Sequence, residues 1–142
     1  MKVLFVCRQN VGRSQMAKAF YNNLTHSHDA EAAGTHVTEK GQTLLERKAA
    51  SSSNNFFVLD VMRDIGMDIS QNTRRALITD DLQRYDLIIS MADTDDTPQW
   101  LLNSPKYVRW DVKDPRGQDY TITAHVRDEI KQKVTQLIQE QP

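Results

Sequence analysis

Cysteine, proline and glycine are all scarce in this chain of 142 residues, which contains one, four and five of them respectively. A lone cysteine cannot form a disulfide within the chain, and a single reactive thiol suits a reducing cytosol better than a secreted setting. No apolar run approaches the roughly 20 residues that a membrane-spanning helix requires. The first residues enter a strand pattern without the basic stretch and cleavage site of a leader peptide. We therefore expect a cytoplasmic protein that does not associate with a membrane.

An excess of basic residues is also absent, since 18 lysines and arginines are balanced by 19 aspartates and glutamates. The resulting net charge of −1 argues against a general nucleic-acid binder, which would carry a basic excess. The apolar content of 39% and charged content of 26% are ordinary for a soluble globular protein. The length fits one domain, and we expect residues 1–142 to form it.

Clusters of metal-ligating residues are incomplete. The segment 26–29 holds two histidines and an aspartate, but a zinc site needs three or four convergent ligands. The run 93–96 holds three aspartates, but it lacks the glycine and the closing glutamate of a calcium loop. We expect these aspartates to supply negative charge at a helix N-terminus, and we expect no metal and no other cofactor.

The single cysteine, Cys7, stands between an apolar strand pattern at 2–7 and a helical pattern that begins near Gln15. Backbone N–H groups lack partners at the start of a helix, and a short loop there can form a concave nest for an anion. Arg13 adds a planar fork that matches phosphate-like oxygens, and Ser14 can donate its hydroxyl to sulfur. Such surroundings favour the thiolate, which is the nucleophilic form.

We therefore predict an oxyanion site with Cys7 as nucleophile and Arg13 as the anion-binding cation. Within the loop, Gly12 allows the backbone to approach a ligand closely, and Asn10 belongs to the residue types that tolerate positive φ. The residues predicted to form or support the phosphate-binding loop are Arg8, Gln9, Asn10, Val11, Gly12 and Ser14.

Asp114 is the candidate for the second half of the site. A thiolate that attacks phosphorus needs an acid to protonate the departing oxygen. Asp114 follows a predicted strand at 106–110 and therefore lies at the same sheet edge as Cys7. Pro115 restricts Asp114 to extended backbone conformations, which fixes the direction of its side chain. Asp111 on the same segment is the nearest rival, although we expect it to serve as a cap or turn residue.

Four strand patterns alternate with helical patterns, which predicts an α/β fold: a doubly wound parallel sheet with helices on both faces. The expected order is the flavodoxin-like order 2-1-3-4, which places the loop after Cys7 outside the carboxyl ends of the strands. The four predicted strands are 2–7, 30–35, 86–91 and 106–110.

Helical periodicity is expected between these strands. Leu24, Leu45 and Ile65 are expected to extend the apolar faces of their helices, and Gly66 is expected to end one of them. The predicted helical segments are 14–25, 38–50, 56–66, 80–85, 99–103 and 123–139.

Several of these motifs together resemble one known family. The pattern Cys-x-x-Asn-x-x-Arg-Ser is matched by Cys7, Asn10, Arg13 and Ser14, an Asp-Pro pair follows at Asp114, and Tyr-Asp-Leu-Ile-Ile-Ser-Met occupies 85–91. The chain thus resembles the low-molecular-weight protein tyrosine phosphatases and their arsenate reductase relatives. The resemblance implies that Asp114 is the general acid and that phosphotyrosine or a related phosphomonoester is hydrolysed through a phosphocysteine.

The partners implied by this resemblance are a phosphorylated protein or a small phosphomonoester, with phosphate, arsenate and vanadate as inhibitory oxyanions. The first alternative is an arsenate reductase that passes its product to an external thiol or redoxin, since this chain has no further cysteine for an internal relay. The second alternative is a module that binds an oxyanion or phosphoprotein without turnover.

The sequence departs from the family at four places. Gln9 replaces a glycine or histidine, and Gly12 replaces a second cysteine, so an oxidised Cys7 would need an outside thiol for its recovery. Arg116 and Gly117 follow Asp-Pro where the phosphatases usually carry aromatic residues, and Phe56 or Tyr120 is the candidate replacement for that wall. The segment 38–55 is longer than usual. It could be a lid, an oligomer contact or a tolerated surface insertion, and we favour the insertion. Further along the chain, the resemblance implies a short helix at 72–77.

Overall fold

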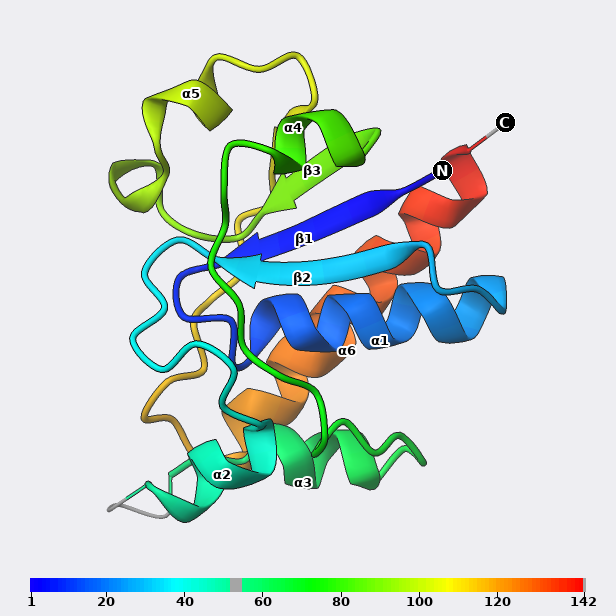
Figure 1. The fold of residues 1–142 in the computed structure, drawn as a ribbon. Coiled ribbons are helices and arrows are strands. Elements are labelled where there is room, and N and C mark those ends of the chain that lie inside the picture. The colour runs from blue at the N-terminus through cyan, green and yellow to red at the C-terminus, as the bar shows by residue number, and fades with distance from the viewer. Residues whose placement is uncertain (52–54, 142) are drawn as a thin grey trace.

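Four parallel strands form one sheet at the centre of the molecule, in the order β2-β1-β3-β4 (Figure 1). The structure is a computed structural model that describes residues 1–51 and 55–141. Each of the four predicted strands is present, shortened by one or two residues, and the predicted fold class is confirmed. The strands are β1 (Val3–Cys7), β2 (Ala30–Gly34), β3 (Leu87–Ser90) and β4 (Tyr107–Arg109).

Strand β1 is buried on both faces, which explains its continuous apolar sequence. Successive strand residues face opposite sides, so Phe5 packs into one hydrophobic cluster while Leu4 and Val6 pack into the other. In register, Cys7 lies opposite Gly34 of β2, and the carboxyl ends of the strands therefore meet at one edge. This edge is the one that the topology rule assigns to ligands.

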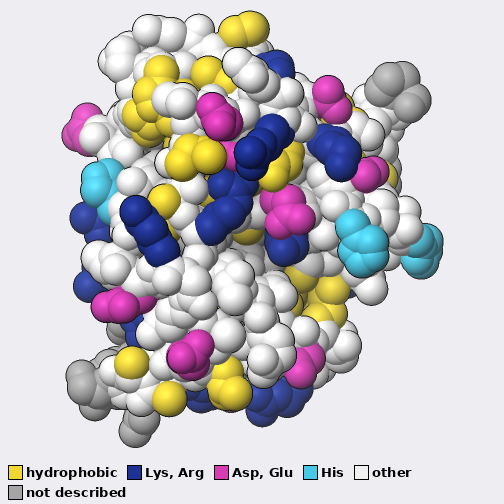
Figure 2. Space-filling model, viewed as in Figure 1, with side chains coloured by type: hydrophobic (Ala, Val, Ile, Leu, Met, Phe, Trp, Pro, Cys, Tyr) yellow, Lys and Arg dark blue, Asp and Glu magenta, His cyan; other side chains and the backbone are white. Residues whose placement is uncertain are grey.

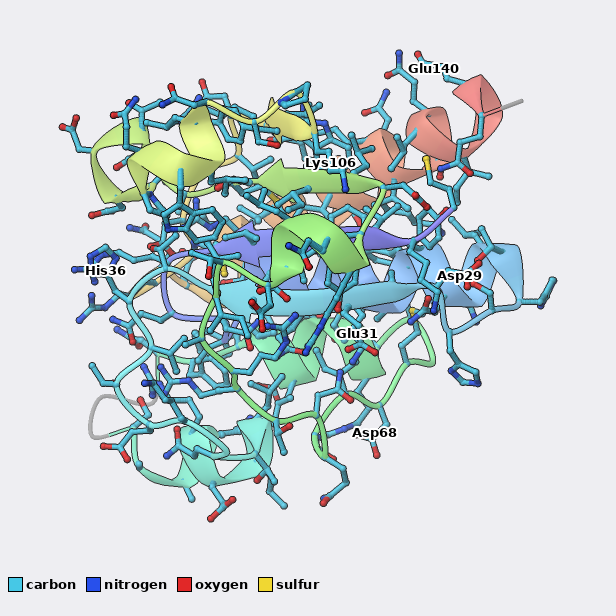
Figure 3. All side chains as sticks on the ribbon, turned by 45° about the horizontal axis from the view of Figure 1, so that its top comes forward. Asp29, Glu31, His36, Asp68, Lys106 and Glu140 are labelled. Carbon is cyan, nitrogen blue, oxygen red and sulfur yellow. The ribbon has the colours of Figure 1, made fainter. Side chains whose placement is uncertain are left out.

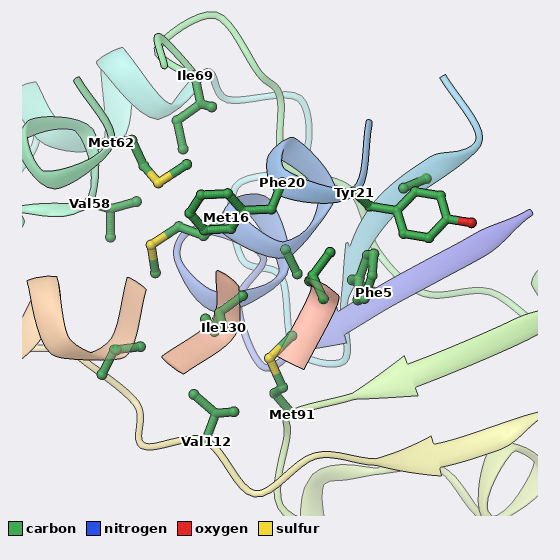
Figure 4. Packing of buried hydrophobic residues seen from close by; sticks show 14 of the residues in the cluster. Phe5, Met16, Phe20, Tyr21, Val58, Met62, Ile69, Met91, Val112 and Ile130 are labelled. Carbon is green, nitrogen blue, oxygen red and sulfur yellow. The ribbon is translucent and has the colours of Figure 1, made fainter. Parts of the chain in front are cut away.

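Helices cover both faces of the sheet. On one face α1 and α6 lie side by side, with α3 packed next to α6 (Figures 1 and 4). Phe5, Met16, Phe20, Met62 and Ile130 belong to the cluster between them. On the other face α4 and α5 cover a smaller cluster. The helices are α1 (Arg13–Thr25), α2 (Leu44–Ala49), α3 (Val58–Arg63), α4 (Asp81–Arg84), α5 (Gln99–Leu102) and α6 (Tyr120–Glu140), with a 3₁₀ turn η1 (Thr94–Asp96).

Charged side chains lie around the outside of these layers (Figure 3). Glu31 on β2 accepts a hydrogen bond from Lys18 of α1 at 3.2 Å, and Lys106 before β4 donates to the carbonyl of Leu82 in α4. Basic and acidic groups are mixed on the face shown in Figure 2. No helix of the described residues has the length and apolar character needed to cross a membrane.

The predicted helices at 38–50 and 72–77 are corrected by the structure. Only Leu44–Ala49 is helical in the first segment, because Thr43 and Glu46 form a reciprocal capping box that starts the helix there. The second segment is extended, and an isolated β-bridge joins Thr43 to Thr73. Because these segments are far apart in the sequence, local periodicity could not reveal their pairing.

Helix ends also differ from the predictions. α3 is shorter than predicted, while α6 begins earlier because the side chain of Asp119 accepts a hydrogen bond from the N–H of Ile122. Leu24, Leu45 and Ile65 are exposed rather than buried, and Ile65 lies beyond the end of α3.

Gly34 at the end of β2 packs directly against the loop that follows Cys7. A Cβ added there would lie 2.8 Å from the carbonyl oxygen of Arg8 and 2.9 Å from the backbone N of Asn10. We expect Gly34→Ala to lower the free energy of unfolding by about 1–3 kcal/mol, because backbone atoms cannot move aside without strain. Urea unfolding measures this loss. Gly12→Ala is the matched control, since its Cβ would meet Val58 at an ordinary 3.5 Å; equal losses in both variants would contradict the prediction.

Candidate active site

The loop after Cys7 turns its carbonyl groups outward. The carbonyl oxygens of Cys7, Arg8, Gln9 and Asn10 all accept hydrogen bonds from other parts of the protein, at 2.7 to 3.1 Å. The donors, in the same order, are Thr35 N, His36 N, Arg74 Nε and Gln15 Nε2. Among the hydrogen bonds of the described residues, none has a backbone donor within 9–12. The arrangement therefore leaves the loop N–H groups available to an anion.

Asn10 holds the curvature of this loop. It adopts the positive φ of 59° and is fully buried. Its side chain donates to Ser14 Oγ at 2.9 Å and accepts from the backbone N–H of Arg75 at 2.8 Å. Asparagine is one of the few residue types that adopts this conformation at modest cost. The loop therefore uses both its tolerance of positive φ and the hydrogen-bonding groups of its side chain.

Replacing Asn10 by alanine should therefore be costly. The variant loses both hydrogen bonds, leaves the buried N–H of Arg75 unsatisfied, and keeps a strained φ. We expect a loss of about 2–4 kcal/mol in the free energy of unfolding. Denaturant titration checks this value. Asn10→Gly separates the two causes, because glycine loses the same two hydrogen bonds as alanine but adopts the positive φ without strain. Stability equal to that of the parent protein in both variants would refute this role.

Cys7 and Ser14 are in contact at the bottom of the loop. Cys7 Sγ lies 3.0 Å from Ser14 Oγ, and Cys7 is 3% exposed. Ser14 Oγ accepts a hydrogen bond from Asn10 Nδ2, which leaves the hydroxyl proton free to be donated to sulfur.

Arg13 is clamped from behind by two carbonyl groups. Its Nη1 donates to the carbonyl oxygens of Met91 and Val112, which follow β3 and β4 at the carboxyl edge of the sheet. Because the guanidinium is planar, fixing one nitrogen orients the other two. Nη2 lies 3.6 Å from Oδ2 of Asp114, and the Arg13 side chain is 8% exposed. Arg13 thus joins the loop to the segment that carries the predicted acid.

Asp114 and its rival Asp111 lie in different surroundings. Asp114 lines the cavity above Cys7, and its Oδ1 accepts a hydrogen bond from the N–H of Arg116 at 3.0 Å. The side chain of Asp111 is 90% exposed, lies 3.8 Å from Arg109, and does not line this cavity. The geometry therefore favours Asp114 over Asp111 for a role beside Cys7.

A cavity of about 470 Å³ opens above the loop. Phe56 and Phe57 line one side together with Val58 and Pro115, whereas Tyr120 lies outside the cavity and packs edge-on against Phe57. Of the two residues predicted to replace the missing aromatic wall, Phe56 occupies that position and Tyr120 does not. Phe57 was not foreseen as a lining residue, because its position at the N-cap of α3 gives no sign of which way the ring points.

The long segment 38–55 forms another wall of the cavity. Gln42, Arg47 and Asn55 from this segment line the cavity, and Arg47 lies over the ring of Phe56 at 5.0 Å from its centroid. The interpretation of the segment as a mere surface insertion is therefore incomplete; residues 52–54 lie outside the described residues. Arg74 also lines the cavity and was missed because its segment was predicted to be an exposed helix.

The remaining loop residues lie at the mouth. Arg8 lines the cavity and pairs with Asp96 of η1 at 3.5 Å, and Gln9 accepts a hydrogen bond from Arg74. Val11 is partly buried against the larger hydrophobic cluster. The aspartates of 93–96 thus lie in and beside a 3₁₀ turn, and two of them, Asp93 and Asp96, pair with Arg109 and Arg8. In the part of the chain that the structure describes, no three His, Cys, Asp or Glu side chains are arranged to hold a metal ion.

This fold and this loop define a flavodoxin-like α/β protein whose single cysteine lies at the start of a loop between the first strand and the first helix. The model of the low molecular weight phosphotyrosine protein phosphatase family matches residues 2–141, and the chain belongs to that family. It is 32% identical over 139 residues to the glutaredoxin arsenate reductase of Synechocystis, which covers 96% of this chain and 95% of the relative.

Two solved structures share the whole fold. The low molecular weight protein tyrosine phosphatase from T. tengcongensis has a TM-score of 0.79 and 25% identity, with 99% of both chains covered. An arsenate reductase in the phosphate binding state has a TM-score of 0.75 and 26% identity, with 99% of this chain and 98% of the other covered. The chain is therefore similar to both branches of its family.

Proposed function

We propose that this protein is a cysteine-dependent phosphatase that hydrolyses phosphotyrosine or a related phosphomonoester through a phosphocysteine. The observation that carries the proposal is the convergence of Cys7, Arg13 and Asp114 on one cavity, with Ser14 hydrogen-bonded to the sulfur. Together these groups supply a nucleophile, a cation for the transferred group and an acid for the leaving group, so a hydrolytic cycle needs no residue from elsewhere.

In the first step the Cys7 thiolate attacks phosphorus in line with the bond to the leaving oxygen. The sulfur–phosphorus bond forms as the phosphorus–oxygen bond breaks, and the proton of Asp114 passes to the departing oxygen. Arg13 and the N–H groups of residues 9–12 hold the three equatorial oxygens, where negative charge is spread in the transition state.

In the second step water replaces the cysteine. Asp114, now a carboxylate, accepts a proton from a water molecule as its oxygen attacks phosphorus. The sulfur–phosphorus bond breaks, the Cys7 thiolate is restored, and inorganic phosphate departs. The hydrogen bond from Ser14 stabilises the thiolate as the leaving group in this step.

The walls of the cavity support an aromatic leaving group. Phe56, Phe57 and Pro115 provide an apolar surface beside the loop, and the volume of about 470 Å³ accommodates a phenyl ring. Phe56 and Phe57 provide aromatic rings, whereas the residues after Asp114-Pro115, Arg116 and Gly117, provide none. The preference for aryl over alkyl phosphates is therefore part of the proposal.

The test is steady-state hydrolysis of phenyl phosphate and of a phosphotyrosine peptide by the reduced protein, without added metal. We expect turnover of both, inhibited competitively by phosphate, arsenate and vanadate. Absence of turnover in a folded protein with a titratable Cys7 thiol would refute the proposal. Phosphate binding without any turnover would instead indicate a binding module.

Arsenate reduction coupled to an external thiol is the second candidate, and the relative from Synechocystis favours it. The Cys7 sulfur would displace water from arsenate, and an external thiol would then attack that sulfur. Arsenite would leave with the electron pair, and a mixed disulfide with Cys7 would remain for a second thiol to reduce. Arsenate-dependent consumption of NADPH in the presence of glutathione, glutaredoxin and glutathione reductase would identify this activity.

A further inference from the structure

Two neighbouring arginines in the extended segment after α3 differ in their ionic partners. Arg75 lies 3.1 Å from the carboxylate of Asp81, whose side chain is fully buried. Arg74 is 2% exposed, yet no carboxylate of the described residues lies within ion-pair distance of it. Among the described residues, Arg74 is thus a buried cation without a carboxylate within ion-pair distance.

Neutral groups hold Arg74 at the back of the loop. Its Nε donates to the carbonyl oxygen of Gln9 at 3.1 Å and its Nη2 to the side chain of the same residue at 3.2 Å. Its Nη1 donates to Gln42 Oε1 at 2.9 Å. Gln9 lies two residues after Cys7, and both Arg74 and Cys7 line the cavity.

The electrostatic setting of Arg74 points to a ligand. Burial lowers the pKa of Arg74, and nearby Arg47 lowers it further, while Glu39 and the Cys7 thiolate act in the opposite direction. A guanidinium nevertheless stays charged at neutral pH. An uncompensated buried charge destabilises a protein, so its retention indicates that an anion compensates it during function.

We propose that Arg74 is a positioning residue whose counter-ion is the doubly charged tetrahedral oxyanion held on the loop, together with the Cys7 thiolate. It fixes the outward direction of the Gln9 carbonyl and adds positive charge behind the site. This inference rests on the proposed oxyanion site, and it assigns to that site a preference for dianions such as phosphate and arsenate over monoanions of similar size.

Binding of inorganic phosphate tests the proposal without requiring turnover. Calorimetry at pH 8, where phosphate is mainly the dianion, should show affinity about tenfold or more weaker in Arg74→Met. Sulfamate, a tetrahedral monoanion, should lose less affinity. Arg84→Met is the matched control, because it removes the same charge from an exposed position on α4 and should leave both affinities unchanged. The melting temperature of phosphate-free Arg74→Met should equal or exceed that of the parent protein.

Alkylation of Cys7 by iodoacetamide tests whether the charge of Arg74 acts on the sulfur. If Arg74 only supported the loop structurally, the pH dependence of alkylation would not change. The pH of half-maximal alkylation depends on the charged groups that line the cavity with the sulfur, which are Arg8, Arg13, Glu39, Arg47, Arg74, Asp114 and Arg116. It should rise in Arg74→Met and return towards the parent value in Arg74→Lys.

Arg74→Gln is the second variant if the methionine variant does not fold, since glutamine can still donate to Gln9. Unchanged phosphate affinity and an unchanged alkylation profile would overturn the inference, with or without a loss of stability. Because neither measurement involves catalysis, these results stand apart from the failure or success of the phosphatase assay.

Discussion

Cys7→Ser is expected to abolish turnover, with a fall in kcat of at least about 10⁴-fold on phenyl phosphate. The serine hydroxyl is far less acidic than a thiol, and the hydrogen bond that Ser14 offers stabilises a thiolate rather than a neutral hydroxyl. Steady-state hydrolysis with a continuous phosphate assay measures the loss. Arsenate-dependent thiol oxidation should vanish in parallel, since both chemistries begin with attack by sulfur.

The fold of this variant should be unaffected, because serine is smaller than cysteine and position 7 is a strand end that already contacts a hydroxyl. Phosphate binding should also persist, since the loop N–H groups and Arg13 are retained. An active Cys7→Ser protein, retaining more than about 1% of kcat, would show that the nucleophile lies elsewhere. A variant that unfolds is recognised by its lost phosphate binding, and Cys7→Ala then takes its place.

Asp114→Asn is expected to lower kcat by about 10²–10⁴-fold on phenyl phosphate, since the amide cannot protonate the leaving oxygen. The effect should depend on the leaving group. A 2,4-dinitrophenolate departs without help, so the loss on that substrate should be much smaller. Measuring kcat across a series of substituted phenyl phosphates gives the slope that separates acid catalysis from a general disturbance of the site.

Asp111→Asn is the control that the chain itself provides. Asp111 lies three residues before Asp114, is 90% exposed in its side chain, and pairs with Arg109 rather than Arg13. Its replacement should leave kcat and the leaving-group slope unchanged. Equal effects of both substitutions, or a loss in Asp114→Asn that is the same for every leaving group, would count against Asp114 as the acid.

The parts of the fold that the sequence predicts are those governed by local rules. β1 is recognisable because a strand buried on both faces needs an unbroken apolar run, and Cys7, Asn10 and Arg13 are recognisable because an anion loop needs those residue types at that spacing. The alternation of strands and helices predicts a parallel sheet for the same local reason. The order 2-1-3-4 is instead that of the flavodoxin-like fold, since alternation alone does not fix which strands are neighbours.

The features that were missed depend on residues distant in sequence. Thr43 and Thr73 form an isolated β-bridge, and 72–77 is extended although the family resemblance implied a short helix there. Arg74 is buried because Gln9 and Gln42 converge on it from two other segments. The directions of Phe56 and Tyr120 likewise follow from packing. The positions of Arg74 and of the aromatic rings around the cavity could therefore be learned only from the structure.

The outward carbonyls of residues 7–10 have a consequence for how the site is lost. Their donors lie just after β2, in the segment after α3 and in α1, so two distant segments and the adjoining helix together hold the loop in shape. A peptide of the loop alone would lack this support and bind phosphate no better than an unfolded chain. In native-state hydrogen exchange, the amides of Thr35 and His36 should therefore open only with the whole domain, together with those of β1. We therefore expect the capacity to bind an oxyanion to be lost only when the whole fold unfolds.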